Sequence, residues 1–228
     1  MKKINFLLLF FLIVLTSLQA QTSVSNTETS DLELKKKATE WVSALNLNDG
    51  AKESRVQFAV FTHLKSIYDW NKNHPFTMVP EGNNPRTGDK LTTLDRQMIV
   101  DSSQPDSVHL NLMAALRKDL TENQVELVLD KYTIGKVAFT LGGYKSIVPD
   151  LTVEEEKVIL TNLKTAREIA VDYKSMKQIS AIFEIYKSKN EQYLNSNGRN
   201  WKALYKAFTD AAKRKKAAKA AEMQTGSK

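Results

Sequence analysis

The sequence predicts an all-α protein: a single compact domain of six or seven helices with one long loop that contains proline and glycine. Apolar residues recur three or four positions apart through most of the chain, which is the spacing of one face of a helix. Two of these segments open with the paired side chains of a capping box. Only one short segment allows a β-strand, and no partner strand is evident for it.

The first two helices are expected over residues 31–45 and 52–71. Asp31 opens the first one, and the sequence NLNDG at residues 46–50 ends it. Pro75 ends the second, because a proline disfavours helical geometry in the residue before it. The apolar stripe of the second helix consists of Val56, Val60, Phe61, Leu64 and Ile67.

The long loop spans residues 75–92, which hold three of the five prolines and two of the eight glycines. Long loops in a compact protein are often functional or disordered. Short helices are expected around residues 94–102 and 107–119. Thr121 and Gln124 then form the capping box that starts the next helix.

The segment TIGKVAFTLGG, residues 133–143, is rich in β-branched residues and glycine, and we interpret it as an extended connector. Thr152 and Glu155 form the capping box of a long helix. Another helix is expected over residues 175–195, and the sequence NSNG at 195–198 ends it. A last amphipathic helix presents Trp201, Leu204, Tyr205 and Phe208 on one face.

Residues 1–20 have the layout of a secretory signal peptide: Lys2 and Lys3, an apolar run, and Ala20 before the expected cleavage point. The apolar run from Ile4 to Leu15 is shorter than the roughly 20 residues that a membrane-spanning helix needs. A lipoprotein anchor would need a cysteine after this run, and the sequence contains none. We therefore expect a periplasmic or extracellular protein with no lipid anchor, no disulfide and no membrane span after signal cleavage.

The chain carries 33 basic and 26 acidic residues, and the basic excess lies near its ends. Polar residues 21–30 are expected to be a disordered leader, residues 31–210 the helical domain, and residues 211–228 a basic, fraying tail. Acidic and basic residues balance in residues 21–210, so the charge indicates no nucleic-acid partner for the domain. Contact of the tail with nucleic acid or an anionic membrane is the alternative to a solvated helical end.

Arg167 lies on the apolar side of the long helix, between Leu163 and Ala170 on a helical wheel. A guanidinium keeps its proton and needs hydrogen-bond acceptors, and burying it without a partner costs several kcal/mol by rough estimate. Arg167 therefore either pairs with a carboxylate elsewhere in the fold or faces a polar pocket. Glu168 and Asp172 lie on the polar arc of the same wheel and are expected in solvent.

Five segments follow one another within residues 32–200: YDWNKNHP, NPRTGDKLTTLDRQMIVDS, SVHLNLMAALRKDLTENQV, TAREIAVDYKS and NEQYLNSNG. In this order and spacing they resemble an uncharacterised secreted family of Bacteroidetes, which is found near polysaccharide-utilisation genes and is described at most as sugar-binding. The family has no established reaction. The resemblance therefore implies a context of complex-polysaccharide utilisation, and not a mechanism.

The sequence contains no motif that fixes a chemistry. It has no cysteine, no paired histidines, no P-loop and no nucleophile elbow, so no metal and no cofactor are expected, and catalytic residues are unknown. A glycoside hydrolase needs two carboxyl groups roughly 5–10 Å apart. Such a pair stays open among Asp69, Asp89, Asp95, Asp101 and Asp130.

Sugar binding needs less: an aromatic ring for the apolar face of the sugar, and polar groups for its hydroxyls. The candidate ligand-binding residues are Trp70, Asn73, His74, Asn84, Arg86, Asp95, Arg96 and Arg167. In the structural alternative Trp70 is core, Asn73 and His74 cap a helix, and Asp95 pairs with Arg96. We expect a non-catalytic protein that binds oligosaccharide or assists its utilisation; a glycan-active enzyme and a structural partner protein are the alternatives.

Overall fold

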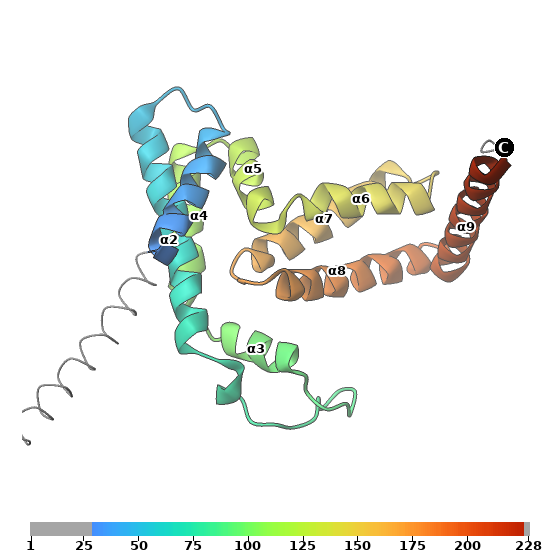
Figure 1. Ribbon diagram of the computed structural model, residues 1–228, viewed down its shortest axis with the longest axis horizontal. Helices are drawn as coiled ribbons and strands as arrows, with labels where there is room; N and C mark the ends of the chain where they lie inside the picture. Colours follow the sequence, from blue (N-terminus) through green and yellow to red (C-terminus); the bar gives the residue numbers. More distant parts are fainter. Residues whose placement is uncertain (1–28, 226–228) are drawn as a thin grey trace, which may run out of the picture. The chain divides into compact units, whose positions relative to one another are not determined.

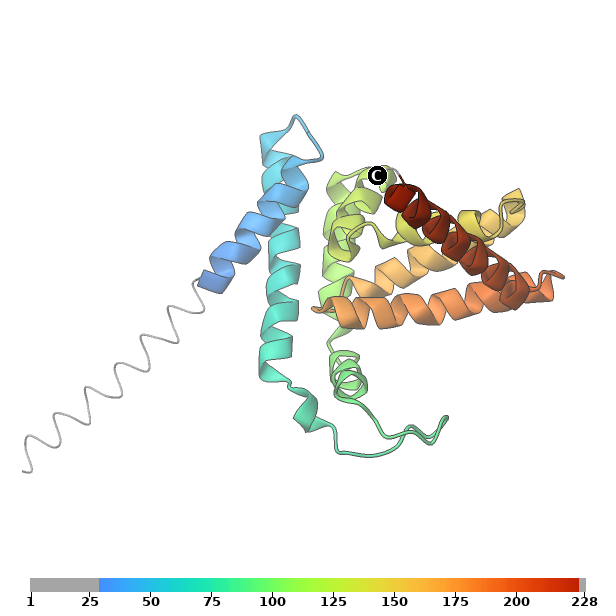
Figure 2. The same ribbon diagram turned by 45° about the vertical axis from the view of Figure 1, so that its right-hand side comes forward.

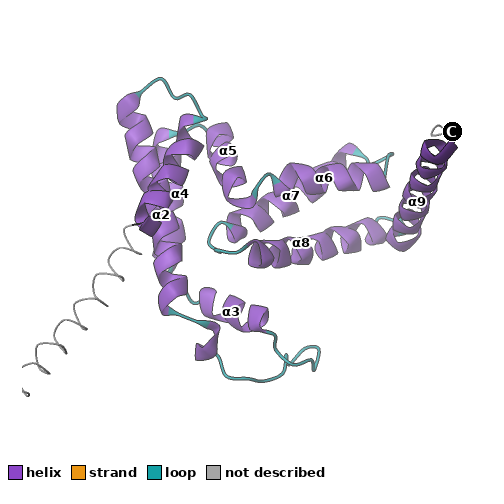
Figure 3. Ribbon diagram, viewed as in Figure 1, coloured by secondary structure: helices purple, strands orange, loops and turns teal. Residues whose placement is uncertain are grey.

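The computed structural model describes residues 29–225, and helices form almost all of its regular structure (Figures 1 and 3). Nine α-helices and one 3-10 helix occur in this range, with no strand beyond an isolated bridge between Asn83 and Lys90. The all-α prediction is confirmed, and the prediction of six or seven helices is too low. The predicted signal peptide and most of the predicted leader lie outside the described residues.

The chain divides into two compact units, a division of which the sequence pattern gives no sign. The first unit contains residues 29–73 and 104–125, and the second contains residues 74–103 and 126–225. The predicted boundaries at residues 20, 30 and 210 stay predictions.

The first unit is built from a helix over residues 29–43, α2 (Gly50–Asn73) and α4 (Asp106–Asp119). Its first helix begins two residues before the predicted start. Helices α2 and α4 pack against each other, and an ion pair of 2.6 Å between Arg55 and Asp119 joins them. Four residues of the predicted stripe of α2 are buried: Val56, Val60, Leu64 and Ile67.

Among the described residues the second unit contains five complete α-helices and one 3-10 helix, and it also includes the end of α5 (Glu122–Thr133), whose start belongs to the first unit. Helices α6, α7 and α8 lie side by side (Figures 1 and 2). The elements of this unit are η1 (Phe76–Met78), α3 (Thr93–Asp101), α6 (Lys136–Ile147), α7 (Val153–Ala170), α8 (Met176–Ser196) and α9 (Trp201–Thr225).

The predicted extended connector at residues 133–143 is wrong, because most of it belongs to helix α6. Ile134 and Gly135 adopt left-handed backbone conformations, with φ of 54° and 65°, and separate α5 from α6. Val137 and Tyr144 then face the core of the second unit. Tertiary packing thus stabilises a helix whose residues have weak helix propensity of their own.

The core of the second unit includes the apolar side of α7, where Ile159, Leu163, Ala166 and Ala170 are fully buried. They pack with apolar side chains of α6 and α8. Helix α7 ends at Ala170, and Tyr173 lies beyond its end and is partly buried.

Side-chain caps at the helix N-termini explain where several of these helices begin. The predicted capping boxes at Thr152–Glu155 and Thr121–Gln124 are both present, and each satisfies backbone N–H groups at a helix N-terminus. The predicted break at residues 195–198 is confirmed as well, with Gly198 at a φ of 84°. Helix α9 continues to Thr225, so the segment predicted as a tail begins as part of a helix.

Candidate functional site

A pocket of about 830 Å³ lies among helices α6, α8 and α9 of the second unit. This volume is in the range of small-molecule binding sites. Its aromatic lining residues are Phe139, Tyr144, Phe183, Trp201 and Tyr205, and its charged lining residues are Lys136, Glu184, Lys187 and Glu191. We call it the α6–α8–α9 pocket.

Two adjacent glycines of α6 help to open this pocket. Gly142 and Gly143 both line it, and a Cβ added at either position would meet nothing within 4 Å. The Ser146 hydroxyl turns back to donate a 2.8 Å hydrogen bond to the carbonyl of Gly142. The glycines therefore leave space at the pocket and do not serve close packing.

Three aromatic rings follow one another from the core to the pocket mouth. The ring of Tyr144 is buried, and its centroid lies 5.2 Å from that of Trp201. Trp201 in turn stacks on Tyr205 at 6.0 Å between ring centroids. Tyr205 is 50% exposed, and Phe139, a further aromatic lining residue, is 83% exposed.

The Tyr144 hydroxyl donates a 3.1 Å hydrogen bond to the backbone carbonyl of Lys187. This bond ties α6 to α8 through two residues that line the pocket. Burial raises the pKa of Tyr144 well above its usual value, so the phenol stays neutral and keeps its proton for this bond.

The charged residues of the pocket come mainly from one face of α8. Glu184, Lys187 and Glu191 lie three and four residues apart, which places them in a row along the helix. The Lys187 ammonium donates to both oxygens of Glu184, at 2.9 and 3.0 Å. Burial raises the pKa of the Glu191 carboxyl, while Lys187 acts in the opposite direction. No described residue donates a hydrogen bond to the Glu191 carboxylate.

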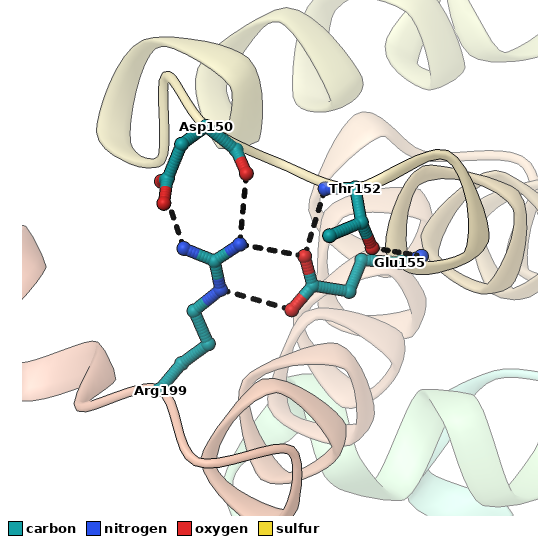
Figure 4. Close-up of polar contacts among 4 residues, drawn as sticks. All are labelled: Asp150, Thr152, Glu155 and Arg199. Atoms are coloured by element: carbon teal, nitrogen blue, oxygen red, sulfur yellow. Dashed lines mark hydrogen bonds and ion pairs between the residues drawn. The ribbon is translucent and has the colours of Figure 1, made fainter.

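A cluster around Arg199, in the turn between α8 and α9, positions the α9 wall of the pocket (Figure 4). Its guanidinium donates to both carboxylate oxygens of Glu155, at 2.9 and 2.8 Å. It also donates to the side chain and the carbonyl of Asp150, at 2.7 and 2.9 Å. Trp201 follows two residues later, so these four bonds fix the start of α9.

Hydrogen bonds from Arg199 lower the pKa of Glu155 to about 2, with a further contribution from the backbone N–H of Thr152. The same contacts raise the pKa of Arg199. Glu155 is thus both the capping-box residue of α7 and the anchor of the turn that leads to α9. One carboxylate joins the start of one helix to the start of another.

The predicted inward orientation of Arg167 is confirmed. Its side chain is only 2% exposed and forms ion pairs of 2.8 Å with Glu126 and 2.7 Å with Asp130, both on α5. Burial acts to lower the pKa of Arg167, but these hydrogen bonds outweigh it and the pKa is raised. Glu168 and Asp172 are partly buried and not fully in solvent as predicted.

The other predicted ligand-binding residues are spread over both units. Trp70 and Asn73 lie at the end of α2 in the first unit. The remaining five belong to the second unit, all within residues 74–103: His74, Asn84, Arg86, Asp95 and Arg96. None of these seven, nor Arg167, lines the α6–α8–α9 pocket.

Several of these side chains stabilise their own loop. Asp95 closes a capping box with Thr92 at the start of α3, and hydrogen bonds from Thr92 lower its pKa. Arg96 donates to the carbonyl of Val79 at 2.8 Å and packs on the ring of Phe76. The Asp95–Arg96 pair of the structural alternative is therefore replaced by separate partners.

The polar residues earlier in the loop also have local partners. The Asn84 side chain accepts a hydrogen bond of 2.9 Å from the backbone of Arg86. The carbonyl of His74 accepts one of 3.1 Å from Gln97. A sugar-binding role for the residues of this loop stays a prediction.

Sequence reasoning missed the pocket because it read α6 as an extended connector. An extended segment has no helical face, so this interpretation does not place Phe139 and Tyr144 on a common helix. The usable signal was the adjacent pair Gly142 and Gly143 among aromatic residues, since glycine inside a helix often has a packing or functional reason.

The fold and the pocket define an all-α protein with an aromatic-lined pocket of ligand size. In the range 29–225 no three histidine, aspartate or glutamate side chains are grouped as a metal site would require. Within the same range no helix has an apolar stretch long enough to span a membrane. The chain belongs to a family of proteins of unknown function, DUF3826, whose model matches residues 32–217. No curated protein matches the chain.

Proposed function

We propose that this protein is an exported, non-catalytic sugar-binding or accessory protein for complex-polysaccharide utilisation, and that sugars bind in the α6–α8–α9 pocket. The observation that carries the proposal is the set of aromatic rings at the pocket, of which Phe139 and Tyr205 are exposed to solvent. The export rests on the predicted signal peptide.

The chemistry of the pocket suits a sugar. A sugar ring has an apolar C–H face, which packs on an aromatic face, and a rim of hydroxyls that need donors and acceptors. Tyr205 and the partly buried Trp201 offer ring surface on α9. The carboxylates of Glu184 and Glu191 and the ammonium of Lys187, all on α8, offer the polar contacts. Burying the exposed ring of Phe139 against a ligand would also remove apolar area from water.

A glycan array of the mature protein, followed by calorimetry on the strongest binders, tests the proposal. Tyr205→Ala should weaken binding about tenfold or more, because a stacked ring contributes on the order of 1–2 kcal/mol. Phe208→Ala is the matched control: it lies on the same helix, is also exposed, and does not line the pocket. No binding to any oligosaccharide, or equal losses in both variants, would overturn the proposal and favour a structural partner protein.

A glycan-active enzyme is the second candidate, and the raised pKa of Glu191 favours it, because a general acid of a glycosidase needs such a shift. However, Glu184 and Glu191 lie seven residues apart on one helix, which is about 10 Å along its axis. That separation is at the upper limit for catalytic carboxylates, which lie roughly 5–10 Å apart and flank the scissile bond. Both glutamates instead lie on one face of α8, and no described carboxylate of α6 or α9 lines the pocket. Binding is therefore the better-supported function. Release of reducing ends from a bound oligosaccharide, lost in Glu191→Gln, would favour the enzyme instead.

A further inference from the structure

The half-buried carboxylate of Glu191 is the polar group of the α6–α8–α9 pocket with the clearest need for a ligand. It lines the pocket, and no described residue donates a hydrogen bond to it. A partly desolvated carboxylate without donors is costly, and an acceptor-only group can be satisfied only by a donor. Sugar hydroxyls are such donors, and a carboxylate can accept from two of them at once.

Both lysines of the pocket have a partner other than Glu191, although Lys187 lies one helical turn from it. Lys187 is engaged by both oxygens of Glu184. Lys136 lies over the ring of Phe183, at 5.7 Å from its centroid. Phe183 precedes Glu191 by eight residues on α8, which is about 12 Å along the helix.

From this arrangement we infer that the pocket selects an uncharged glycan over an acidic one, and that Glu191 is the residue that makes the selection. The inference rests on the proposed function and names the class of sugar for that same site. Glu191 accepts hydrogen bonds from hydroxyls of a neutral sugar ring that packs on Trp201 and Tyr205. A uronic acid in the same position brings a second carboxylate against Glu191, and like charges in a poorly solvated site repel each other strongly.

Calorimetry with matched probes tests the inference. Cellohexaose and maltohexaose are the neutral probes, and the same hexasaccharides oxidised to carboxylates at C6 are their acidic counterparts. We expect a neutral hexasaccharide to bind the mature protein at least tenfold more tightly than its oxidised counterpart. Equal or tighter binding of the oxidised form would overturn the inference and leave the proposed function standing. Binding of neither form, together with a blank glycan array, would contradict the proposed function itself.

The variant Glu191→Gln keeps the size of the side chain and removes its charge. It should weaken binding of the neutral probe about tenfold, since hydrogen bonds to an ionised acceptor are stronger. It should also reduce the preference over the oxidised probe to less than threefold. Glu154→Gln, an exposed position outside the pocket, is the control and should match the wild type. A Glu191→Gln protein that keeps both the wild-type affinity and the preference would show that Glu191 does not select the ligand.

Discussion

Acid should release the Arg199 cluster, and the variant Glu155→Gln isolates the contribution of its central charge. The pKa of Glu155 is about 2 in the folded protein, against an ordinary 4.5. This lowering corresponds to about 3 kcal/mol of folding free energy at neutral pH. Arg199 is in part exposed, and Asp150 is largely so, which screens the interaction. We therefore expect about 2 kcal/mol.

The sign follows from proton uptake. Between pH 4.5 and 2 the unfolded state binds the proton of Glu155 and the folded state does not, so stability falls as the pH is lowered through this interval. Glutamine keeps one acceptor oxygen for Arg199 but has no charge to lose. At pH 7 the free energy of unfolding of Glu155→Gln should be about 2 kcal/mol lower than that of the wild type. Near pH 2.5 the difference should shrink to less than about 1 kcal/mol.

Urea melts of both proteins at pH 7, 4.5, 3.5 and 2.5 measure this difference directly. Other carboxylates whose pKa is lowered, such as Asp95, also make the protein less stable in acid. Their contribution is the same in the wild type and the variant, so it cancels in the difference between the two. Parallel loss of stability in wild type and variant across the whole range would refute the reasoning. It would mean that Arg199 does not hold Glu155 in its charged form.

Three further outcomes are expected. Arg167→Ala should destabilise the protein by about 3 kcal/mol in urea melts, because it removes the ion pair of the partly buried Asp130 and leaves Glu126 with Lys164 alone; a loss as small as that of Glu168→Ala, about 0.5–1 kcal/mol, would contradict this. Gly143→Ala should raise thermal stability by about 0.5–1 kcal/mol, since its Cβ meets nothing, yet should weaken glycan binding; unchanged affinity would place the ligand elsewhere. Mass spectrometry of the exported protein should find an N-terminus near Gln21 and no lipid, whereas an intact Met1 would contradict export by signal cleavage.

The sequence predicts well those features that depend on neighbours along the chain. The capping box of Thr152 and Glu155 sets the start of α7 and with it the phase of the helical wheel. Once the phase is known, the burial of Leu163 and the inward position of Arg167 follow from the spacing alone. The partners of Arg167 do not follow, because Glu126 and Asp130 belong to a helix that only the tertiary fold brings near.

The pocket could not be predicted for the same reason. Phe139 and Tyr205 are separated by more than sixty positions in the sequence and line one pocket only because α6 and α9 contact each other within the second unit. Helix α6 itself carries little local signal: its glycines and β-branched residues disfavour a helix, and the burial of Tyr144 compensates. In the long loop, by contrast, Asp95 and Arg96 looked like binding groups because their local hydrogen-bonding roles are not visible in the sequence.

The position of the pocket at the very start of α9 has a practical consequence. Trp201 and Tyr205 occupy the first two turns of a helix that continues to Thr225. Twenty residues of helix separate Tyr205 from that point, a distance of about 30 Å. The side chains of residues 211–218 are all exposed, so this stretch is free of packing that an attachment would disturb. A biotin or affinity tag placed after residue 225 would hold the protein on a sensor surface with its binding face well clear of the support.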